Sequence, residues 1–243
     1  MGTVEFESLV KEIKAILQAH ANPAIVKKYS RYFVEGYDAY GVDLKKIRNE
    51  RNAWLKDNRE ELGLEGFLLL GDQLVQSGKY EEGFIVIDFI TYFKNEFTPA
   101  TFERLGGWLE HGLYNWAHTD GFSGEVLSAF LVNKIVSLDA FSGWRSSPSK
   151  WKRRAVAVTL IKALKTDISI AALLKFVNPM MMDEEKVVHQ GLGWFLRETW
   201  KKSPEQVEIF LFKWKDQCAR LIIQYATEKM TKERKAKFKR LSR

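Results

Sequence analysis

The chain has 243 residues, of which 46% are hydrophobic and 28% charged, and this composition is typical of a globular protein and excludes a disordered one. Lys and Arg outnumber Asp and Glu by 38 to 31, which gives a net charge of +7. A basic protein of this kind favours an anionic partner, and the charge alone leaves nucleic acid, acidic protein and anionic lipid open.

The location of the protein is indicated by its cysteine content and by its apolar runs. Cys218 is the only cysteine, so no internal disulfide can form and a reduced, cytoplasmic protein is expected. The longest apolar stretch is too short to span a bilayer, and the N-terminus lacks the features of a signal peptide. We therefore expect an intracellular protein with no membrane contact.

Helical periodicity recurs along the chain, because apolar residues repeat at spacings of three and four. Such stripes are carried by Val10, Ile13, Ile16 and Leu17, by Leu68, Leu69, Leu74 and Val75, and by Phe84, Ile87, Ile90 and Phe93. The run FIVIDFITYF, residues 84–93, could be mistaken for a strand, but its spacing favours a buried helix.

Each of the five prolines follows a residue that can cap a helix, so each predicts a helix start. These prolines are Pro23, Pro99, Pro148, Pro179 and Pro204. Many short helices joined by turns predict an all-α chain, and such a series resembles a solenoid of helical pairs. We predict a single domain over residues 1–230, followed by a basic C-terminal tail over 231–243.

The tail is the most basic part of the chain, since residues 228–243 hold eight Lys or Arg and two Glu. Two interpretations are open: a solvated, frayed helix end, or an arm that binds phosphates without sequence preference.

The stretch VVHQGLGWFLRETWKKSPEQ, residues 187–206, places two glycines in a predicted helix. Val188, Leu192, Phe195 and Thr199 form its core stripe, while Trp194 falls on another face with Gln190, Arg197 and Lys201. An aromatic ring beside cations suits a sugar–phosphate partner. Alternatively, Trp194 packs on a neighbouring helix and the glycines permit close helix packing.

Two further stretches combine tryptophan with charge. WRSSPSKWKRRAV, residues 144–156, has five basic residues and no acid, and its Arg154 lies on or beside an apolar stripe, where an arginine needs an anionic partner. The alternative there is a solvated basic helix start. In YNWAHTDGFSGEV, residues 114–126, Trp116 and Asp120 share one helix face. The alternative for Asp120 is an N-cap of the following helix.

Several common catalytic signatures are missing. The sequence contains no phosphate-binding glycine loop, no HExxH zinc motif and no metal-ligand spacing among its four histidines. We therefore expect no metal and no cofactor. A carboxylate, aromatic rings and arginines remain, and these suit a reaction with a cationic transition state.

Four motifs together resemble the AlkD-type family of DNA alkylation repair glycosylases, over residues 22–226. They are Trp116 with Asp120, Arg154 in WKRRAV, Trp194 with Arg197 in GWFLRE, and Tyr32 with Gly41 in RYFVEGYDAYGV. The sequence departs from the family pattern in its basic tail. It also differs within the Trp–Asp element, where His118 and Thr119 occupy positions that vary in the family.

The resemblance implies a HEAT-like solenoid with a concave basic cleft around duplex DNA. It also implies hydrolysis of the N-glycosidic bond of cationic purines alkylated at N3 or N7, such as 3-methyladenine and 7-methylguanine. We expect the protein to be a monomer associated with the nucleoid. The expected catalytic residues are Asp120, Trp116 and Trp194, and the expected DNA-binding residues are Arg154, Arg197, Tyr32, Lys152, Arg153 and Lys201.

Two other functions stay open. One is a noncatalytic HEAT-like protein that binds branched or damaged DNA. The other is a helical scaffold whose basic face binds an acidic protein, and it predicts no special role for Asp120.

Overall fold

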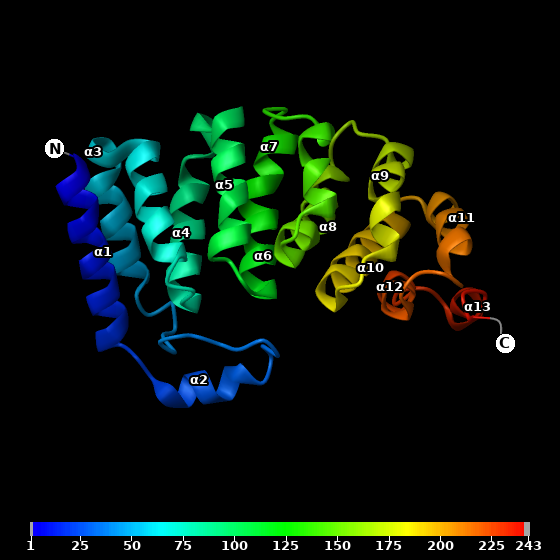
Figure 1. The fold of residues 1–243 in the computed structure, drawn as a ribbon, viewed down its shortest axis with the longest axis horizontal. Coiled ribbons are helices and arrows are strands. Elements are labelled where there is room, and N and C mark those ends of the chain that lie inside the picture. The colour runs from blue at the N-terminus through cyan, green and yellow to red at the C-terminus, as the bar shows by residue number, and fades with distance from the viewer. Residues whose placement is uncertain (1, 241–243) are drawn as a thin grey trace. The chain divides into compact units, whose positions relative to one another are not determined.

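The computed structural model describes residues 2–240, and these residues form helices and connecting turns without a strand (Figure 1). The prediction of an all-α chain is therefore confirmed. The chain divides into two compact units, Met1–Gly121 and Phe122–Arg243, and each is described by itself.

Unit 1 is built on a layer of packed helices in which α3 contacts α1, α4 and α5. Its elements are α1 (Gly2–Ala19), α2 (Pro23–Ser30), α3 (Arg48–Val75), α4 (Tyr80–Tyr92), the 3-10 turn η1 (Lys94–Glu96), α5 (Pro99–His111) and α6 (Trp116–Phe122), whose last residue crosses the boundary. The long helix α3 is kinked at Gly63, where φ is +54° and the left-handed backbone favours glycine.

Unit 2 is centred on α10, which packs against both α8 and α12. Its elements are the π-helical turn η2 (Ser123–Leu127), α7 (Ser128–Val132), the 3-10 turns η3 (Leu138–Phe141) and η4 (Gly143–Ser146), α8 (Lys150–Ala163), α9 (Ile170–Val177), the 3-10 turn η5 (Asn178–Met182), α10 (Lys186–Trp200), α11 (Pro204–Trp214), α12 (Arg220–Ala226) and α13 (Lys232–Ala236).

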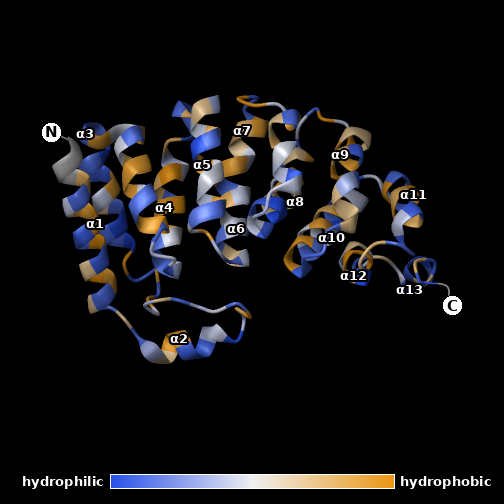
Figure 2. Ribbon diagram, in the orientation of Figure 1, coloured by the Kyte–Doolittle hydropathy of each residue, from blue (hydrophilic) through white to orange (hydrophobic). Residues whose placement is uncertain are grey.

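Most residues of the predicted apolar stripes are buried, and hydrophobic (orange) and hydrophilic (blue) residues both occur along the helices in Figure 2. Ile13, Leu17, Ile87 and Ile90 are buried, although Leu69 is exposed. The run that resembles a strand lies largely within α4, so its interpretation as a buried helix is confirmed.

The prolines predict most helix starts correctly. Pro23, Pro99 and Pro204 each open a helix, and Pro179 lies in the first turn of η5. The prediction at Pro148 is early, because α8 begins at Lys150 with the side chain of Ser149 as its cap.

The described part of the tail is solvent-exposed except at Phe238, and it is attached to unit 2 through that residue and its neighbours. Phe238 is fully buried and stacks on Phe212 at 4.6 Å between ring centroids. Arg220 donates to the Phe238 carbonyl at 2.8 Å, and Arg240 donates to the Cys218 carbonyl at 2.5 Å. Residues 241–243 of the predicted tail lie outside the described residues.

Within residues 2–240, no helix is both long and apolar enough to cross a membrane.

Candidate functional site

The helix α6 carries the Trp–Asp pair, and Asn115 caps its start. The Asn115 side chain accepts a hydrogen bond from the His118 backbone N–H at 2.8 Å, and the Thr119 hydroxyl donates to the Asn115 carbonyl at 2.9 Å. Asp120 lies inside the helix and half-buried, so its alternative role as an N-cap is wrong. Trp116 and Asp120 are therefore one helical turn apart, as their spacing predicts.

The indole of Trp116 is held in one orientation although 40% of the residue is exposed. Its Nε1–H donates to the backbone carbonyl of Tyr32 at 3.1 Å. Its ring stacks on Phe33, with 5.5 Å between centroids and 17° between planes. Since both partners come from the segment after α2, that segment determines which edge of the indole solvent can reach.

Tyr32 is an exposed residue in the segment that follows α2. Its hydroxyl accepts a hydrogen bond from Arg31 at 2.8 Å, and the same guanidinium lies 4.8 Å from the Tyr32 ring centroid. The residue is 52% exposed, so it is accessible to a partner.

Gly41, the other residue of the Tyr32 motif, is required by geometry. Its φ is +80°, and a Cβ there would lie 2.2 Å from the Asn22 carbonyl oxygen. The buried carboxylate of Glu81 accepts hydrogen bonds from the backbone N–H groups of Tyr40, Gly41 and Val42 at 2.9, 2.8 and 2.9 Å. Sequence reasoning missed Glu81, because its partners lie about 40 positions earlier and leave no local signal.

His118 lies between Trp116 and Asp120 in α6 and is a buried, neutral residue. Its Nε2–H donates to the Tyr80 carbonyl at 2.7 Å, so its Nδ1 accepts from the Asn115 amide at 2.8 Å. Burial lowers the pKa of His118 to about 4, although the hydrogen bond to Tyr80 opposes this shift. This histidine therefore supports the helix start and carries no charge near neutral pH.

In unit 2, Arg154 lies on the buried side of α8. The residue is 5% exposed, and its Nη1 donates to the Val187 carbonyl at 2.5 Å. A Cβ at Gly191 would lie 3.3 Å from the Arg154 Cγ, so the first glycine of α10 leaves room for this arginine. The prediction that Arg154 lies on an apolar stripe is confirmed.

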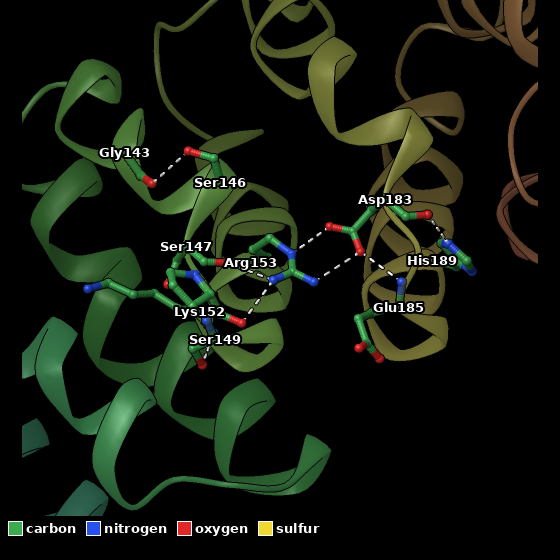
Figure 3. Close-up of polar contacts among 10 residues, drawn as sticks. Gly143, Ser146, Ser147, Ser149, Lys152, Arg153, Asp183, Glu185 and His189 are labelled. Atoms are coloured by element: carbon green, nitrogen blue, oxygen red, sulfur yellow. Dashed lines mark hydrogen bonds and ion pairs between the residues drawn. The ribbon is translucent and has the colours of Figure 1, made fainter.

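Arg153, the neighbouring residue, is engaged by its own protein (Figure 3). Its Nε and Nη2 donate to the two carboxylate oxygens of Asp183 at 2.6 and 3.3 Å, and its Nη1 donates to the Ser147 carbonyl at 2.7 Å. The guanidinium therefore ties the start of α8 to the segment before α10. Its role in DNA binding stays a prediction.

Lys152 reaches over an aromatic ring of the same unit. Its Nζ lies 4.9 Å from the Trp144 ring centroid, a cation–π distance.

The glycines of the 187–206 stretch are explained by helix packing. A Cβ at Gly193 would lie 2.4 Å from the Tyr225 Cβ and 2.9 Å from the Ile222 carbonyl oxygen, both in α12. The four predicted core residues of α10 are all fully buried, whereas Trp194 is partly exposed. The sequence therefore predicts the core face of α10 correctly, and the close-packing explanation of Gly193 is confirmed.

The cations beside Trp194 are ion-paired. Arg197 donates to Glu198 at 3.0 Å and to Glu228 at 2.5 Å, and Lys201 donates to Glu198 at 2.7 Å. Burial alone would raise the pKa of Glu198, but hydrogen bonds from Lys201 and Arg197 hold that pKa below its ordinary value. A phosphate at Arg197 has to compete with these carboxylates.

No group of three or more His, Cys, Asp or Glu that could hold a metal is found between residues 2 and 240.

Comparison with known proteins identifies the family. The fold is similar to that of a solved structure, a predicted DNA alkylation repair enzyme from Enterococcus faecalis, with a TM-score of 0.75 and 17% identity, over 88% of this chain and 98% of that chain. No curated protein matches the sequence significantly. The model of the DNA alkylation repair enzyme family matches residues 13–230, and the chain therefore belongs to the family of DNA alkylation repair enzymes.

Proposed function

We propose that this protein is a monomeric DNA glycosylase that releases purines alkylated at N3 or N7 from duplex DNA, without metal or cofactor. One observation carries the proposal: α6 presents the Asp120 carboxylate one turn from the indole of Trp116, which is both partly exposed and held in place. Membership of the DNA alkylation repair family supports DNA as the substrate.

The reaction does not need a general acid to protonate the leaving base, because alkylation at N3 or N7 already makes the purine a cation and hence a good leaving group. As the N-glycosidic bond lengthens, the deoxyribose becomes an oxocarbenium ion. The Asp120 carboxylate stabilises that positive charge and orients the water that attacks the anomeric carbon. The electron pair of the broken bond leaves with the purine, and the water proton passes to the carboxylate or to solvent.

Aromatic rings and cations have separate roles in this proposal. The indole of Trp116 packs against the sugar, and its electron-rich face favours the developing charge. Trp194 is the second tryptophan to which we assign a catalytic role. The DNA phosphates are contacted by Tyr32 of unit 1 and, in unit 2, by Lys152, Arg154, Arg197 and Lys201. Arg153 adds positive charge at the start of α8, although its guanidinium is paired with Asp183.

The test is release of free base from methylated duplex DNA, followed by chromatography. We expect the wild type to release 7-methylguanine, and Asp120→Asn to lower the single-turnover rate by about 100-fold or more while duplex affinity is retained. Asp57→Asn, which removes an exposed carboxylate of α3 in the same unit, is the matched control and should be fully active.

Two outcomes contradict the proposal. A wild-type protein that binds duplex DNA but releases no base is a noncatalytic DNA-binding protein. An Asp120→Asn variant that excises as fast as the wild type removes Asp120 from the reaction.

A further inference from the structure

We infer that α2 and the residues that follow it form a second contact with the DNA, in which Lys27, Lys28 and Arg31 bind backbone phosphates of the duplex. This inference rests on duplex DNA being the substrate under the proposed function. It assigns a binding surface to a helix for which the sequence motifs indicate only Tyr32.

The first observation is that α2 does not pack like the other helices of unit 1. It buries none of its residues, and it runs crosswise at the end of α1, apart from the layer formed by α1, α3 and α4 (Figure 1). Short helices in water are marginal, and most are stabilised by burying an apolar face. A helix of eight residues without such a face needs another reason to be kept in place.

Contacts at its first turn attach α2 to unit 1. The Asn22 side chain accepts from the Ala24 N–H at 3.0 Å, and the Asn22 N–H donates to the Tyr40 carbonyl at 2.8 Å. Residues 40–42 are in turn held by the Glu81 carboxylate. The start of the helix is therefore anchored, while its C-terminal half projects its side chains into solvent.

The second observation is the charge of this segment. ANPAIVKKYSRYFV, residues 21–34, contains three cations and no acid. Lys14, Arg51 and Lys79, on other elements of unit 1, each pair with a carboxylate. Among the described residues of unit 1, no carboxylate forms an ion pair with Lys27, Lys28 or Arg31. Three exposed cations without an acidic partner on a fixed backbone complement a polyanion.

The third observation is the presence of exposed aromatic rings among these cations. Tyr29 and Tyr32 are 41% and 52% exposed, and their ring centroids are 6.4 Å apart. The Lys28 ammonium lies 5.3 Å from the Tyr29 ring, and the Arg31 guanidinium lies 4.8 Å from the Tyr32 ring. Phenol rings beside cations suit a sugar–phosphate backbone, where the hydroxyl donates to phosphate and the ring packs on the sugar.

The position of this surface connects it to the reaction. The Tyr32 carbonyl accepts the hydrogen bond of the Trp116 indole, and Phe33 stacks on that indole. A DNA strand whose phosphates lie along α2 therefore passes directly beside Trp116. The surface would hold the duplex in a position where one nucleotide meets Trp116 and Asp120.

The experiment measures binding of undamaged duplex DNA by fluorescence anisotropy over a range of salt concentrations. Lys27→Gln/Lys28→Gln is compared with Lys11→Gln/Lys56→Gln, which removes two exposed lysines from α1 and α3 and changes the net charge equally. We expect the α2 variant to bind about 10-fold more weakly near 0.1 M salt, and the slope of log K against log[salt] to fall by about 2. The control variant should keep nearly the wild-type affinity and the wild-type salt slope. Arg31→Gln should lower the slope by about 1.

The outcomes separate this inference from the proposed function. If the α2 variant binds as the control does, while the wild type releases 7-methylguanine, the inference is wrong and the proposed function stands. If binding falls as expected but the wild type releases no base, α2 binds DNA and the proposed glycosylase function is wrong. Circular dichroism and melting temperatures of all variants should match the wild type, because α2 buries no residue.

Discussion

The indole N–H of Trp116 donates a hydrogen bond to the backbone carbonyl of Tyr32 across 84 positions of sequence, at 3.1 Å. Phe33 stacks on the same ring, so two successive residues hold the indole by one polar and one aromatic contact. A partly exposed tryptophan held in this way is suited to contact a substrate with little loss of side-chain freedom on binding.

Phe33→Leu should slow base release much more than it weakens the DNA complex. Leucine keeps an apolar contact but cannot stack, so the indole of Trp116 gains freedom and its alignment with the sugar is lost. We expect the single-turnover rate to fall by about 10-fold, while the dissociation constant for duplex DNA rises by a much smaller factor, because phosphate contacts supply most of the affinity. Val34→Ala, at a neighbouring residue that is 98% exposed, is the control and should keep the wild-type rate. A normal rate in Phe33→Leu would mean that the stacking does not position Trp116.

Gly193→Ala should destabilise the protein, although alanine is the better helix former by about 1 kcal/mol. The added Cβ would lie 2.4 Å from the Tyr225 Cβ and 2.9 Å from a backbone oxygen of α12, so α10 and α12 have to move apart. We expect a net loss of about 1–3 kcal/mol in the free energy of unfolding, measured by urea denaturation. Gly107→Ala is the matched control, because a Cβ at that glycine of α5 meets nothing within 4 Å, and it should be neutral or stabilising.

Acid should weaken the folded state through His118. Its pKa is about 4 when folded, against an ordinary value of 6.5, so between these two pH values the unfolded chain binds the proton and the folded chain does not. Stability therefore rises with pH across this window, by up to about 1.4 kcal/mol per pH unit, and is lost as the pH falls towards 4.

The measurement for His118 is urea unfolding at pH 7.5 and pH 5. His118→Gln keeps a polar side chain but cannot take up the proton, so the difference in stability between the two pH values should shrink. His111→Gln, at an exposed histidine of α5, should leave that difference at the wild-type value. An unchanged difference in His118→Gln would assign the acid sensitivity to another group.

Glu228→Gln should strengthen DNA binding. Glu228 accepts a hydrogen bond from Arg197, and hydrogen bonds from Lys229 and Arg197 hold the pKa of this carboxyl below its ordinary value. Removing the charge of Glu228 frees the Arg197 guanidinium for a phosphate and reduces the repulsion between this site and the DNA backbone. We expect about 3- to 10-fold tighter binding at low salt, with the gain reduced in high salt. Glu205→Gln, an exposed change of equal charge in α11, should give a smaller gain; equal gains would exclude Arg197 as a phosphate contact.

The sequence by itself determined the features that depend on near neighbours. Residues three and four apart share a helix face whatever the tertiary structure, so the core stripe of α10 and the Trp116–Asp120 pair follow from spacing alone. The prolines with capping residues before them mark helix starts for the same local reason. The resemblance of four short motifs indicated the DNA alkylation repair family, and the match over residues 13–230 confirmed it.

Only the tertiary structure decided which distant groups meet. Glu81 holds the backbone N–H groups of residues 40–42, and Arg153 pairs with Asp183, 30 positions away. Gly193 is needed because α12 approaches it, which the spacing within α10 cannot show. Such contacts depend on how helices pack and on which buried polar group lacks water, and no periodicity in the chain encodes either one.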